Sequence, residues 1–431
     1  MSEDVFAVAG KPVLHSLSPD LFRNAGLKYT RICPVEPEDI FYLAINLDIK
    51  GINLTMPYKS TLLDSLEEID IQAEDICAVN TIIRKNEKWK GYNTDIIGVR
   101  KTLNDTEFQN VLVIGAGNAA KAAVSAVIDR ADKIFIYNRT PSKVKKLQKL
   151  FNSGKISEVK KNELRKILEK TELIISAVPD LEEDLLNIFY SNIYEDHTIL
   201  DAVYHRSKLE EIAKIRKCKY ISGINWLINQ AEEAYYLFTG NDSFSERGEL
   251  KRGFSKLQPI ACNEEKKQRR NFILTGFSGS GKSTLGKILA QKLNLEFIDT
   301  DDLIEQKTGE SIENIFTEYG EDYFRQLEKK EITEFQEKGY IISTGGGMPV
   351  HSGKALLENG YIIYLYTDLD ISLLRTQNSA RPLMNLENRE IERLYKSRLP
   401  EYVKYSDMVI NSNHPVKQVT ENLYEEISRI I

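Results

Sequence analysis

A chain of 431 residues, 42% of them hydrophobic, has the length for about three domains and enough apolar material for a core in each. A net charge of -6 and the lack of a long basic tract argue against a nucleic-acid partner and favour small-molecule substrates. No apolar run is long enough to cross a bilayer, and the acidic N-terminus lacks the features of a signal peptide, so we expect a cytoplasmic protein with no membrane partner.

The first region of the chain places hydroxyl groups next to short apolar segments. Residues 5–9 predict a strand, and Ser16 and Ser18 follow it in a loop, before a helix that we expect to start near Pro19. Hydroxyls in this arrangement suit a polyhydroxylated ligand. Serine and proline are also common at helix starts, so the pattern alone is weak.

A lysine and an aspartate farther along could form a proton-transfer pair. Residues 52–54 predict a strand that Pro57 ends, and we expect Lys59 to start a helix at the carboxyl edge of the sheet, where open α/β sheets bind ligands. Asp95 follows a second stretch that is rich in amides and hydroxyls. Each charge could hold the other in its working state. From spacing alone, a surface lysine and a helix-capping aspartate explain the two residues better.

Four motifs in this region resemble the substrate domain of the shikimate dehydrogenases, in the same order. They are HSLSP at residues 15–19, NLTMPYK at 53–59, AVNT at 78–81 and NTD at 93–95. The resemblance implies that Lys59 and Asp95 are the catalytic pair. It also implies that four further residues contact the substrate, namely Ser16, Ser18, Thr55 and Asn80.

A dinucleotide fingerprint opens the second region. Residues 110–114 predict a buried strand that runs into GAGNAA and then a helix to about Arg130, the context that a G-x-G-x-x-A motif requires. The candidate cofactor-binding residues of this turn are Gly115, Gly117, Asn118, Ala119 and Ala120.

The end of the next strand indicates which dinucleotide binds. Residues 133–137 predict a strand that ends at Asn138, Arg139 and Thr140, where an NAD site would place an acidic residue. Arg139 can instead bind a 2′-phosphate in a forked geometry, so we expect NADP(H). The same Asn-Arg-Thr string is similar to that of NADP-dependent shikimate dehydrogenases.

Further strands at 173–178, 199–203 and 220–221 alternate with helices, which predicts a doubly wound Rossmann sheet. The resemblance implies that Tyr204 and Gln230 lie near nicotinamide and substrate, and that Gly223 belongs to the cofactor site. We therefore expect a substrate domain over 1–98, joined by helices at about 225–258, and an NADP-binding domain over 99–225. Charged residues without apolar periodicity predict a linker at 259–270.

The third region begins with a phosphate-binding loop. Residues 271–275 predict a buried strand, GFSGSGKST follows at 276–284, and 285–293 has helical apolar spacing. The glycines allow backbone N–H groups to approach phosphates, Lys282 would reach the β- and γ-phosphates of ATP, and Ser283 could ligate Mg²⁺. The candidate nucleotide-binding residues are Gly279, Ser280, Gly281, Lys282, Ser283 and Thr284.

Charged residues and glycines then recur at predicted strand ends. A strand ending at Asp299 could hold Mg²⁺ through water, with Asp301 orienting a hydroxyl acceptor, although helix capping explains such aspartates too. Arg375 and Arg381 bracket a polar stretch that could form a lid over ATP.

These features resemble shikimate kinase from about residue 270 to 431. The resemblance implies that shikimate is bound by Asp301, Arg325, Gly346, Gly347 and Arg398. It further implies that Asp301 is catalytic with Lys282, that Asp299 and Ser283 serve the metal, and that Arg381 is the lid arginine.

The sequence thus predicts an α/β chain with a shikimate dehydrogenase-like substrate domain, a Rossmann domain and, over 271–431, a P-loop kinase domain with a parallel sheet. We expect NADPH-dependent reduction of 3-dehydroshikimate to shikimate, followed by ATP-dependent phosphorylation of shikimate. One alternative is an NAD-linked quinate or cyclitol dehydrogenase joined to a kinase for another small alcohol. Another is a sensor that binds these metabolites without turnover.

Overall fold

The computed structural model describes residues 4–104, 106–203, 207–240, 271–335, 339–377 and 387–431. These residues fall into two units that alternate along the sequence. The first unit lies within Met1–Pro19, Gly26–Tyr58 and Glu265–Ile431, and the second within Asp20–Ala25 and Lys59–Glu264. The domain boundaries expected from the sequence stay a prediction, and the expected linker at 259–270 lies outside the described residues.

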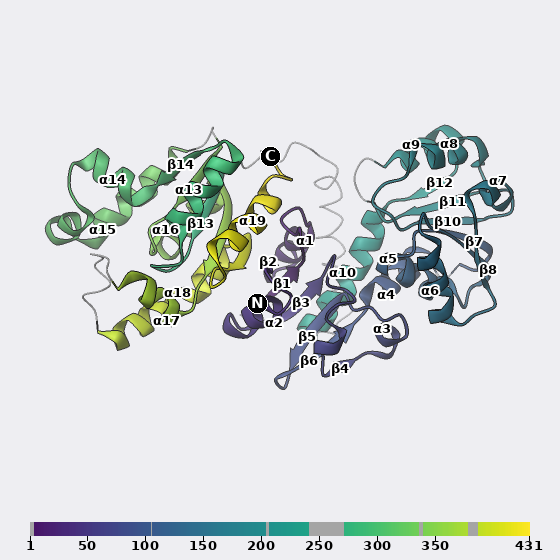
Figure 1. Cartoon of the computed structure of the whole chain (residues 1–431), viewed down its shortest axis with the longest axis horizontal. Helices are drawn as coiled ribbons and strands as arrows, with labels where there is room; N and C mark the ends of the chain where they lie inside the picture. The colour runs from purple at the N-terminus through teal and green to yellow at the C-terminus, as the bar shows by residue number, and fades with distance from the viewer. Residues whose placement is uncertain (1–3, 105, 204–206, 241–270, 336–338, 378–386) are drawn as a thin grey trace. The chain divides into compact units, whose positions relative to one another are not determined.

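Parallel strands run through the first unit in one continuous order (Figure 1). In spatial sequence they are β14 (Glu296–Asp299), β15 (Tyr340–Ser343), β13 (Asn271–Thr275), β16 (Gly360–Tyr366), β17 (Met408–Asn411), β2 (Lys28–Cys33), β1 (Val5–Ala9) and β3 (Ile49–Leu54). Every neighbouring pair in this order is parallel. The parallel sheet that the phosphate-loop region predicts is therefore confirmed, and it extends into strands from the start of the chain.

Helices cover this sheet. The helices of the first unit are α2 (Asp39–Asn46), α13 (Lys282–Leu293), α14 (Thr300–Thr308), α15 (Ile312–Thr333), α16 (Met348–Asn359), α17 (Leu369–Thr376), α18 (Asn388–Tyr405) and α19 (Val416–Ile427). Helix α13 packs against α19, and α16 packs against α15 and α18. Helix α18 also contacts both β16 and β2. The helix expected at 285–293 is confirmed as α13.

The second unit contains a doubly wound sheet with the order β12-β11-β10-β7-β8-β9. Its strands are β7 (Phe108–Ile114), β8 (Ala131–Tyr137), β9 (Ile156–Glu158), β10 (Leu173–Ser176), β11 (Thr198–Asp201) and β12 (Lys219–Ile221). Successive side chains of β7 pack into two different cores. Val111 and Val113 belong to the core on one face of the sheet, and Leu112 and Ile114 belong to the core on the other. The predicted Rossmann sheet is confirmed.

Helices line both faces of that sheet. They are α4 (Thr94–Thr102), α5 (Asn118–Val127), α6 (Pro141–Phe151), α7 (Leu164–Leu168), α8 (Glu183–Asn192), α9 (Lys208–Arg216) and α10 (Gly223–Thr239), with a short 3₁₀ turn at Lys161–Glu163. The α10 helix packs closely on α4. Side chains of α4, α5, α6 and α10 share one core, and those of α7, α8 and α9 share the other.

The remaining elements of the second unit precede α4. Strands β5 (Thr81–Lys85) and β6 (Lys88–Tyr92) form an antiparallel hairpin, and β4 (Glu68–Ile69) pairs in parallel with β6. A 3₁₀ turn (Leu63–Ser65) precedes β4, and helix α3 (Ile71–Asp75) connects β4 to β5. Helix α1 (Ser18–Asn24) begins in the first unit. Among the helices that the structure describes, none has the length and apolarity to span a bilayer.

One local prediction is wrong. Lys59 does not start a helix, because residues 56–61 form turns and the next helical element is the 3₁₀ turn from Leu63. The Tyr58 N–H donates to the Thr55 carbonyl at 2.9 Å, which closes a turn directly after β3. This turn, rather than a helix start, positions Lys59.

Candidate active sites

The phosphate loop of the first unit joins β13 to α13, as expected. Its glycines Gly276, Gly279 and Gly281 have φ of 149°, 82° and 90°, a region that residues with a Cβ rarely adopt. A Cβ on Gly279 would also lie 2.6 Å from the Ser372 carbonyl oxygen. Lys282 is buried and donates to the carbonyls of Gly276 (2.9 Å) and Phe277 (3.0 Å). The loop therefore keeps a buried cation within a glycine-rich turn at the start of α13, a combination that suits polyphosphates.

Oxygen ligands lie at the start of α13 and the end of β14. The Ser283 hydroxyl donates to Asp299 Oδ2 at 2.7 Å, and Asp299 Oδ1 accepts the Asp301 N–H at 3.1 Å. Burial and the charge of Asp299 raise the pKa of the neighbouring Asp302. A hydroxyl beside a carboxylate suits Mg²⁺, which takes few protein ligands and keeps waters and phosphate oxygens for the rest.

Arg325 stands against the glycine segment that follows β15. Its Nη1 donates to Glu328 Oε2 at 2.6 Å, and its Nη2 donates to Glu321 Oε1 at 2.8 Å. A Cβ on Gly347 would lie 2.6 Å from Arg325 Nη2, and one on Gly345 would lie 2.8 Å from Asp301 Oδ1. The structure therefore brings Arg325, Asp301 and the glycines together, as the sequence predicts.

Arg398 of α18 reaches the same place. Its guanidinium lies 5.9 Å from the ring centre of Phe277 in the phosphate loop. Its Nη1 is 3.5 Å from where a Gly346 Cβ would stand, and the Gly346 carbonyl accepts the Tyr402 hydroxyl at 2.6 Å. Two arginines thus converge on one glycine segment beside the phosphate loop, which suits an anionic small molecule.

Arg375 contacts the phosphate loop from α17. Its Nη1 donates to the Gly279 carbonyl at 3.4 Å, and its Nη2 donates to the Ser412 carbonyl at 3.0 Å. The predicted nucleotide-site position of Arg375 is consistent with these contacts. The other predicted lid arginine, Arg381, lies outside the described residues.

Glu328 is a residue of this site that the sequence interpretation missed. Its carboxylate is fully buried, and Oε1 is 2.5 Å from where a Gly345 Cβ would stand. Burial raises the pKa of Glu328 to about 7, although Arg325 opposes this shift. The usable signal was its spacing of three from Arg325, which places both side chains on one face of a helix.

The Lys59–Asp95 pair belongs to the second unit. Lys59 Nζ lies 2.5 Å from Asp95 Oδ2, and the two side chains are 19% and 6% exposed. Asp95 sits in the first turn of α4, where the helix dipole favours a carboxylate. The sequence alone left these residues as separate surface groups, whereas the structure places them in a mostly buried ion pair.

Asn80 ties the surroundings of this pair together. Its Oδ1 accepts the Thr94 N–H at 2.7 Å, and its Nδ2 donates to Gln230 Oε1 at 3.0 Å. The next residue back, Val79, donates its N–H to the Lys59 carbonyl at 2.7 Å. Asn80, Gln230, Lys59 and the start of α4 therefore form one connected group. The predicted position of Tyr204 lies outside the described residues.

The predicted hydroxyl ligands of the first region lie in the first unit. Ser16 and Ser18 are half-buried, and the Ser16 hydroxyl accepts the Ser18 N–H at 3.3 Å. Thr55 is also half-buried and directly follows β3, where its N–H donates to the Ala9 carbonyl at 2.9 Å. Phe22 of α1 is buried, and its ring centre lies 5.7 Å from that of Phe238.

The dinucleotide fingerprint has the expected backbone. Gly115 follows β7 with φ of 114°, and Gly117 caps α5 with no atom within 4 Å of a built Cβ. The N-terminus of α5 is therefore open for a phosphate to approach. Asn118, Ala119 and Ala120 form its first turn.

Arg139 and Gly223 occupy two strand ends of the same sheet. The Arg139 side chain is 84% exposed after β8 and makes one long contact, 3.4 Å to Glu182. Asn138 next to it donates to the Thr140 carbonyl at 3.0 Å and shapes the turn. A Cβ on Gly223 would lie 2.4 Å from the Ala202 carbonyl oxygen, so only glycine fits beside the end of β11.

Comparison with known proteins assigns three families to successive parts of the chain. The family described as shikimate dehydrogenase substrate binding domain matches residues 8–82, and that described as shikimate / quinate 5-dehydrogenase matches 98–185. The family described as shikimate kinase matches 278–428.

Individual relatives agree with this division. The shikimate dehydrogenase (NADP(+)) of Aquifex aeolicus is 32% identical over 253 residues, which cover 55% of this chain and 91% of the relative. The shikimate kinase of Sulfurihydrogenibium sp. is 39% identical over 165 residues, which cover 37% of this chain and 99% of the relative. A crystal structure of the Aquifex aeolicus shikimate dehydrogenase matches with a TM-score of 0.52 and 32% identity, covering 58% of this chain and 97% of that one.

Proposed function

The chain belongs to the shikimate dehydrogenase family over its N-terminal part and to the shikimate kinase family over its C-terminal part, and from this premise we propose that it is a bifunctional enzyme. The first activity reduces 3-dehydroshikimate to shikimate with NADPH. The second transfers the γ-phosphoryl of ATP to shikimate. The observation that carries the proposal is that one chain holds both the Lys59–Asp95 pair and the complete phosphate loop with Lys282.

In the reduction, the protein's own task is to manage a proton. NADPH supplies the hydride that a ketone carbon accepts. The carbonyl oxygen then needs a proton, and the Lys59 ammonium is the group that would donate it. Asp95 Oδ2, 2.5 Å from Lys59 Nζ, holds the lysine side chain in place. Ser16, Ser18, Thr55 and Asn80 are proposed to bind the hydroxyls and carboxylate of the substrate, with Gln230 and Tyr204 near the reacting carbon.

The residues of the second unit fit NADP(H). Gly117 leaves the start of α5 open, and Arg139 offers an exposed guanidinium where a 2′-phosphate would need one. We propose that Gly115, Gly117, Asn118, Ala119 and Ala120 hold the pyrophosphate, and that Asn138, Arg139 and Thr140 hold the adenosine ribose. Gly223 allows α10 to start close to the sheet, beside the proposed nicotinamide site.

In the phosphorylation, the protein positions an acceptor alcohol and neutralises charge. Arg325 and Arg398 are proposed to bind the substrate carboxylate, Gly346 and Gly347 to offer backbone contacts, and Asp301 to orient the hydroxyl. Lys282, Gly279, Ser280, Gly281 and Thr284 would hold the phosphates, and Arg375 and Arg381 would close the nucleotide site.

Ser283 and Asp299 fit Mg²⁺, because their oxygens lie 2.7 Å apart at the mouth of the phosphate loop. The metal, when bound, supplies positive charge beside the phosphates. We propose that Asp299 reaches it through a water. The protein's partners would then be small molecules only, and the cytoplasm stays the expected compartment.

The alternative of an NAD-linked quinate dehydrogenase keeps some support, because the matching family is described for both shikimate and quinate. Arg139 favours the phosphorylated cofactor and therefore speaks against it. A sensor without turnover is disfavoured, since each of the residues expected to react is present.

A coupled assay tests the proposal. NADPH loss is followed with 3-dehydroshikimate, and ADP release is followed after ATP and Mg²⁺ are added. Lys59→Ala should lower the first rate by about 10²- to 10⁴-fold, the usual contribution of a positioned acid, and leave the second unchanged. Lys282→Ala should abolish only the second, so each variant controls for the folding of the other.

Two results would contradict the proposal. NADH consumption with the ketone derived from quinate, without NADPH consumption with 3-dehydroshikimate, would favour the NAD-linked quinate alternative. Tight binding of shikimate without release of NADP⁺ or ADP would favour the sensor.

A further inference from the structure

The edges of two groups of strands meet in the first unit. Strand β2 ends the group β2-β1-β3 from the start of the chain, and β17 ends the group that carries the phosphate loop. The two pair in parallel, with Val409 opposite Ile32 and Ile410 opposite Cys33. All four side chains are buried. Residues more than 370 positions apart therefore share one continuous sheet.

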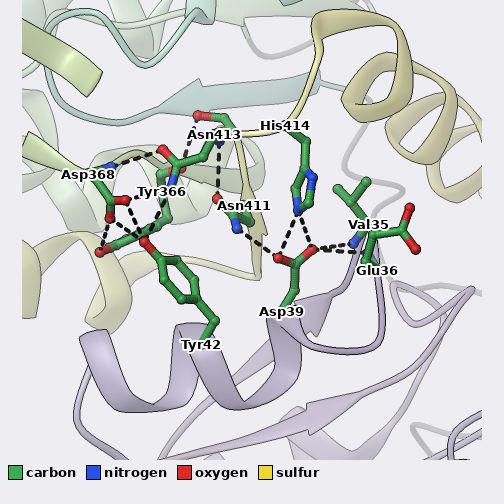
Figure 2. Close-up of polar contacts among 10 residues, drawn as sticks. Val35, Glu36, Asp39, Tyr42, Tyr366, Asp368, Asn411, Asn413 and His414 are labelled. Carbon is green, nitrogen blue, oxygen red and sulfur yellow. Dashed lines mark hydrogen bonds and ion pairs between the residues drawn. The ribbon is translucent and has the colours of Figure 1, made fainter. Parts of the chain in front are cut away.

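Asp39, at the start of α2, binds the segment that follows β17 (Figure 2). Its Oδ1 accepts from Asn411 Nδ2 at 2.7 Å and lies 2.9 Å from His414 Nε2. Its Oδ2 accepts the Val35 N–H at 2.8 Å. Asp39 is 4% exposed, so protein donors rather than water supply most of the hydrogen bonds to its carboxylate.

Tyr42, one turn farther along α2, binds Asp368, the residue that precedes α17. Its hydroxyl donates to Asp368 Oδ1 at 2.6 Å, and Asn413 Nδ2 donates to Asp368 Oδ2 at 3.0 Å. Asn413 also accepts the Asp368 N–H at 3.1 Å. Figure 2 shows that the two carboxylates, Asp39 and Asp368, bracket the segment from Asn411 to His414.

The same segment supports the phosphate loop from its other side. The Ser412 hydroxyl donates to the Ser280 carbonyl at 3.0 Å, and the Ser412 carbonyl accepts from Arg375. Ser412 is buried. A displacement of residues 411–414 would therefore move the backbone of the proposed nucleotide site.

Glu426 of α19 holds the loop that carries Ser16. Its carboxylate accepts the N–H groups of Val13 (2.9 Å) and Leu14 (2.8 Å) and is 1% exposed. Burial raises the pKa of Glu426, and the two N–H donors oppose that shift. Arg31 adds a second link, because its guanidinium donates to the carbonyls of Ser16 (2.7 Å) and Asp407 (3.1 Å).

We propose that the segment from Ser406 to Ile427 is a shared support for both active sites. In this role Glu426 is a positioning residue for the dehydrogenase substrate, although it lies in the kinase-family part of the chain. Asp39 is a positioning residue for the kinase nucleotide, although it lies in the dehydrogenase-family part. The inference rests on the proposed function, since it assigns Ser16 to one substrate and Ser280 to the other.

Glu426→Gln tests the first half in the full chain. With its oxygen in place of Oε2, the amide would put its N–H₂ group where Oε1 now lies, 2.9 Å from the Val13 nitrogen, so two donors would face each other and the loop at 10–17 would shift. We expect KM for 3-dehydroshikimate to rise about tenfold, with kcat and the kinase parameters within about twofold. Glu425→Gln is the matched control, because Glu425 is exposed and forms a long ion pair with Lys11, at 4.0 Å.

Asp39→Asn tests the second half. The substitution would replace one carboxylate oxygen of Asp39, which accepts hydrogen bonds, by an amide N–H₂ group. Asn411 and His414 would then be bound less tightly. We expect KM for ATP to rise about tenfold while KM for shikimate in the kinase reaction is unchanged. Glu38→Gln is the matched control, because Glu38 is exposed at the preceding position.

A readout independent of turnover separates this inference from the proposed function. In Glu426→Gln, hydrogen exchange at Val13 and Leu14 should rise, and it should stay at the wild-type value in Glu425→Gln. If the wild-type chain turns over 3-dehydroshikimate but Glu426→Gln leaves both KM and this exchange unchanged, the inference is overturned and the proposed function stands. If the wild type has no such activity, the proposed function fails. In that case, unchanged hydrogen exchange at Val13 and Leu14 in Glu426→Gln would also overturn the proposed role of residues 406–427. Should Glu426→Gln fail to fold, Glu426→Asp keeps the charge, shortens its reach and must give the same direction of change.

Discussion

Glu328 is buried beside Arg325 and the glycine segment, and its pKa of about 7 puts its charge change in the range where the enzyme would work. The raised pKa means that the folded protein holds this proton more tightly than the unfolded chain. Its contribution to stability is therefore full below the ordinary glutamate pKa and is lost as the pH rises through about 7.

A pH effect on the kinase follows from Glu328. Above about pH 7 the ionised carboxylate neutralises part of the charge of Arg325, so an anionic substrate should bind less tightly there. We expect KM for shikimate to rise across this pH range in the wild type and to lose that inflection in Glu328→Gln. Kinase rates measured between pH 5.5 and 8.5 with ATP saturating would check this, and an unchanged inflection in the variant would assign it to another group.

Arg139 is the single residue that we expect to decide cofactor choice. A charge-assisted hydrogen bond to a phosphate is worth about 1.5–3 kcal/mol, so Arg139→Ala should raise KM for NADPH roughly tenfold to a hundredfold. KM for NADH should not change, because NADH lacks the 2′-phosphate. Comparison of the two cofactors in one variant is its own control. A parallel loss for both would show that Arg139 acts on the fold of the turn instead.

At the scale of elements, the packing of α4 on α10 brings the Lys59–Asp95 pair and Gln230 into one part of the second unit. Gly98 lies at the contact, where a Cβ would be 2.9 Å from Trp226 and 3.0 Å from the Gln230 Cβ. Gly98→Ala should therefore overpack the contact, lower stability by about 1–3 kcal/mol and raise KM for 3-dehydroshikimate. Gly154→Ala is the control, because a Cβ there meets nothing within 4 Å. Equal melting temperatures for the two variants would show that α10 shifts to accommodate the added Cβ with no loss of stability.

The elements themselves were largely predictable, and the reasons are local. Residues 5–9, 133–137 and 271–275 each combine apolar runs with a following glycine or polar turn, and each is a strand in the structure. The helix expected at Lys59 was wrong because a turn closed by the Tyr58 N–H follows β3 directly. A proline after a strand indicates an end, but it does not indicate what comes next.

The site residues also divide into those that could be predicted from the sequence and those that could not. Motifs with a fixed spacing, such as the phosphate loop, could be predicted with their strand, turn and helix, because the glycine positions determine the backbone conformation. The roles of their residues stay predictions. Asp39 and Glu426 could not be predicted, because an isolated acidic residue in a charged chain resembles a solvated surface group. Glu328 offered one signal, its spacing of three from Arg325. Only the fold shows that all three are buried with their donors.

At the scale of the whole molecule, we expect paired strands to unfold together and the two units to unfold separately. Hydrogen exchange with increasing denaturant should remove protection from β2 and β17 together, because they share ladder hydrogen bonds and a buried seam. Peptides covering β10 of the second unit provide the comparison and should lose protection at a different denaturant concentration. Loss of β2 together with β10 and before β17 would contradict this division.

The seam between β2 and β17 also bears on what either half would do alone. An exposed edge strand presents unpaired N–H and C=O groups that recruit other chains, and β-aggregation commonly starts from such edges. Here the end strand of each group covers the end strand of the other, and Ile32, Cys33, Val409 and Ile410 are buried between them. Cutting the chain into its two family-sized pieces would expose both apolar edges at once, so we expect each piece to be less soluble than the whole chain.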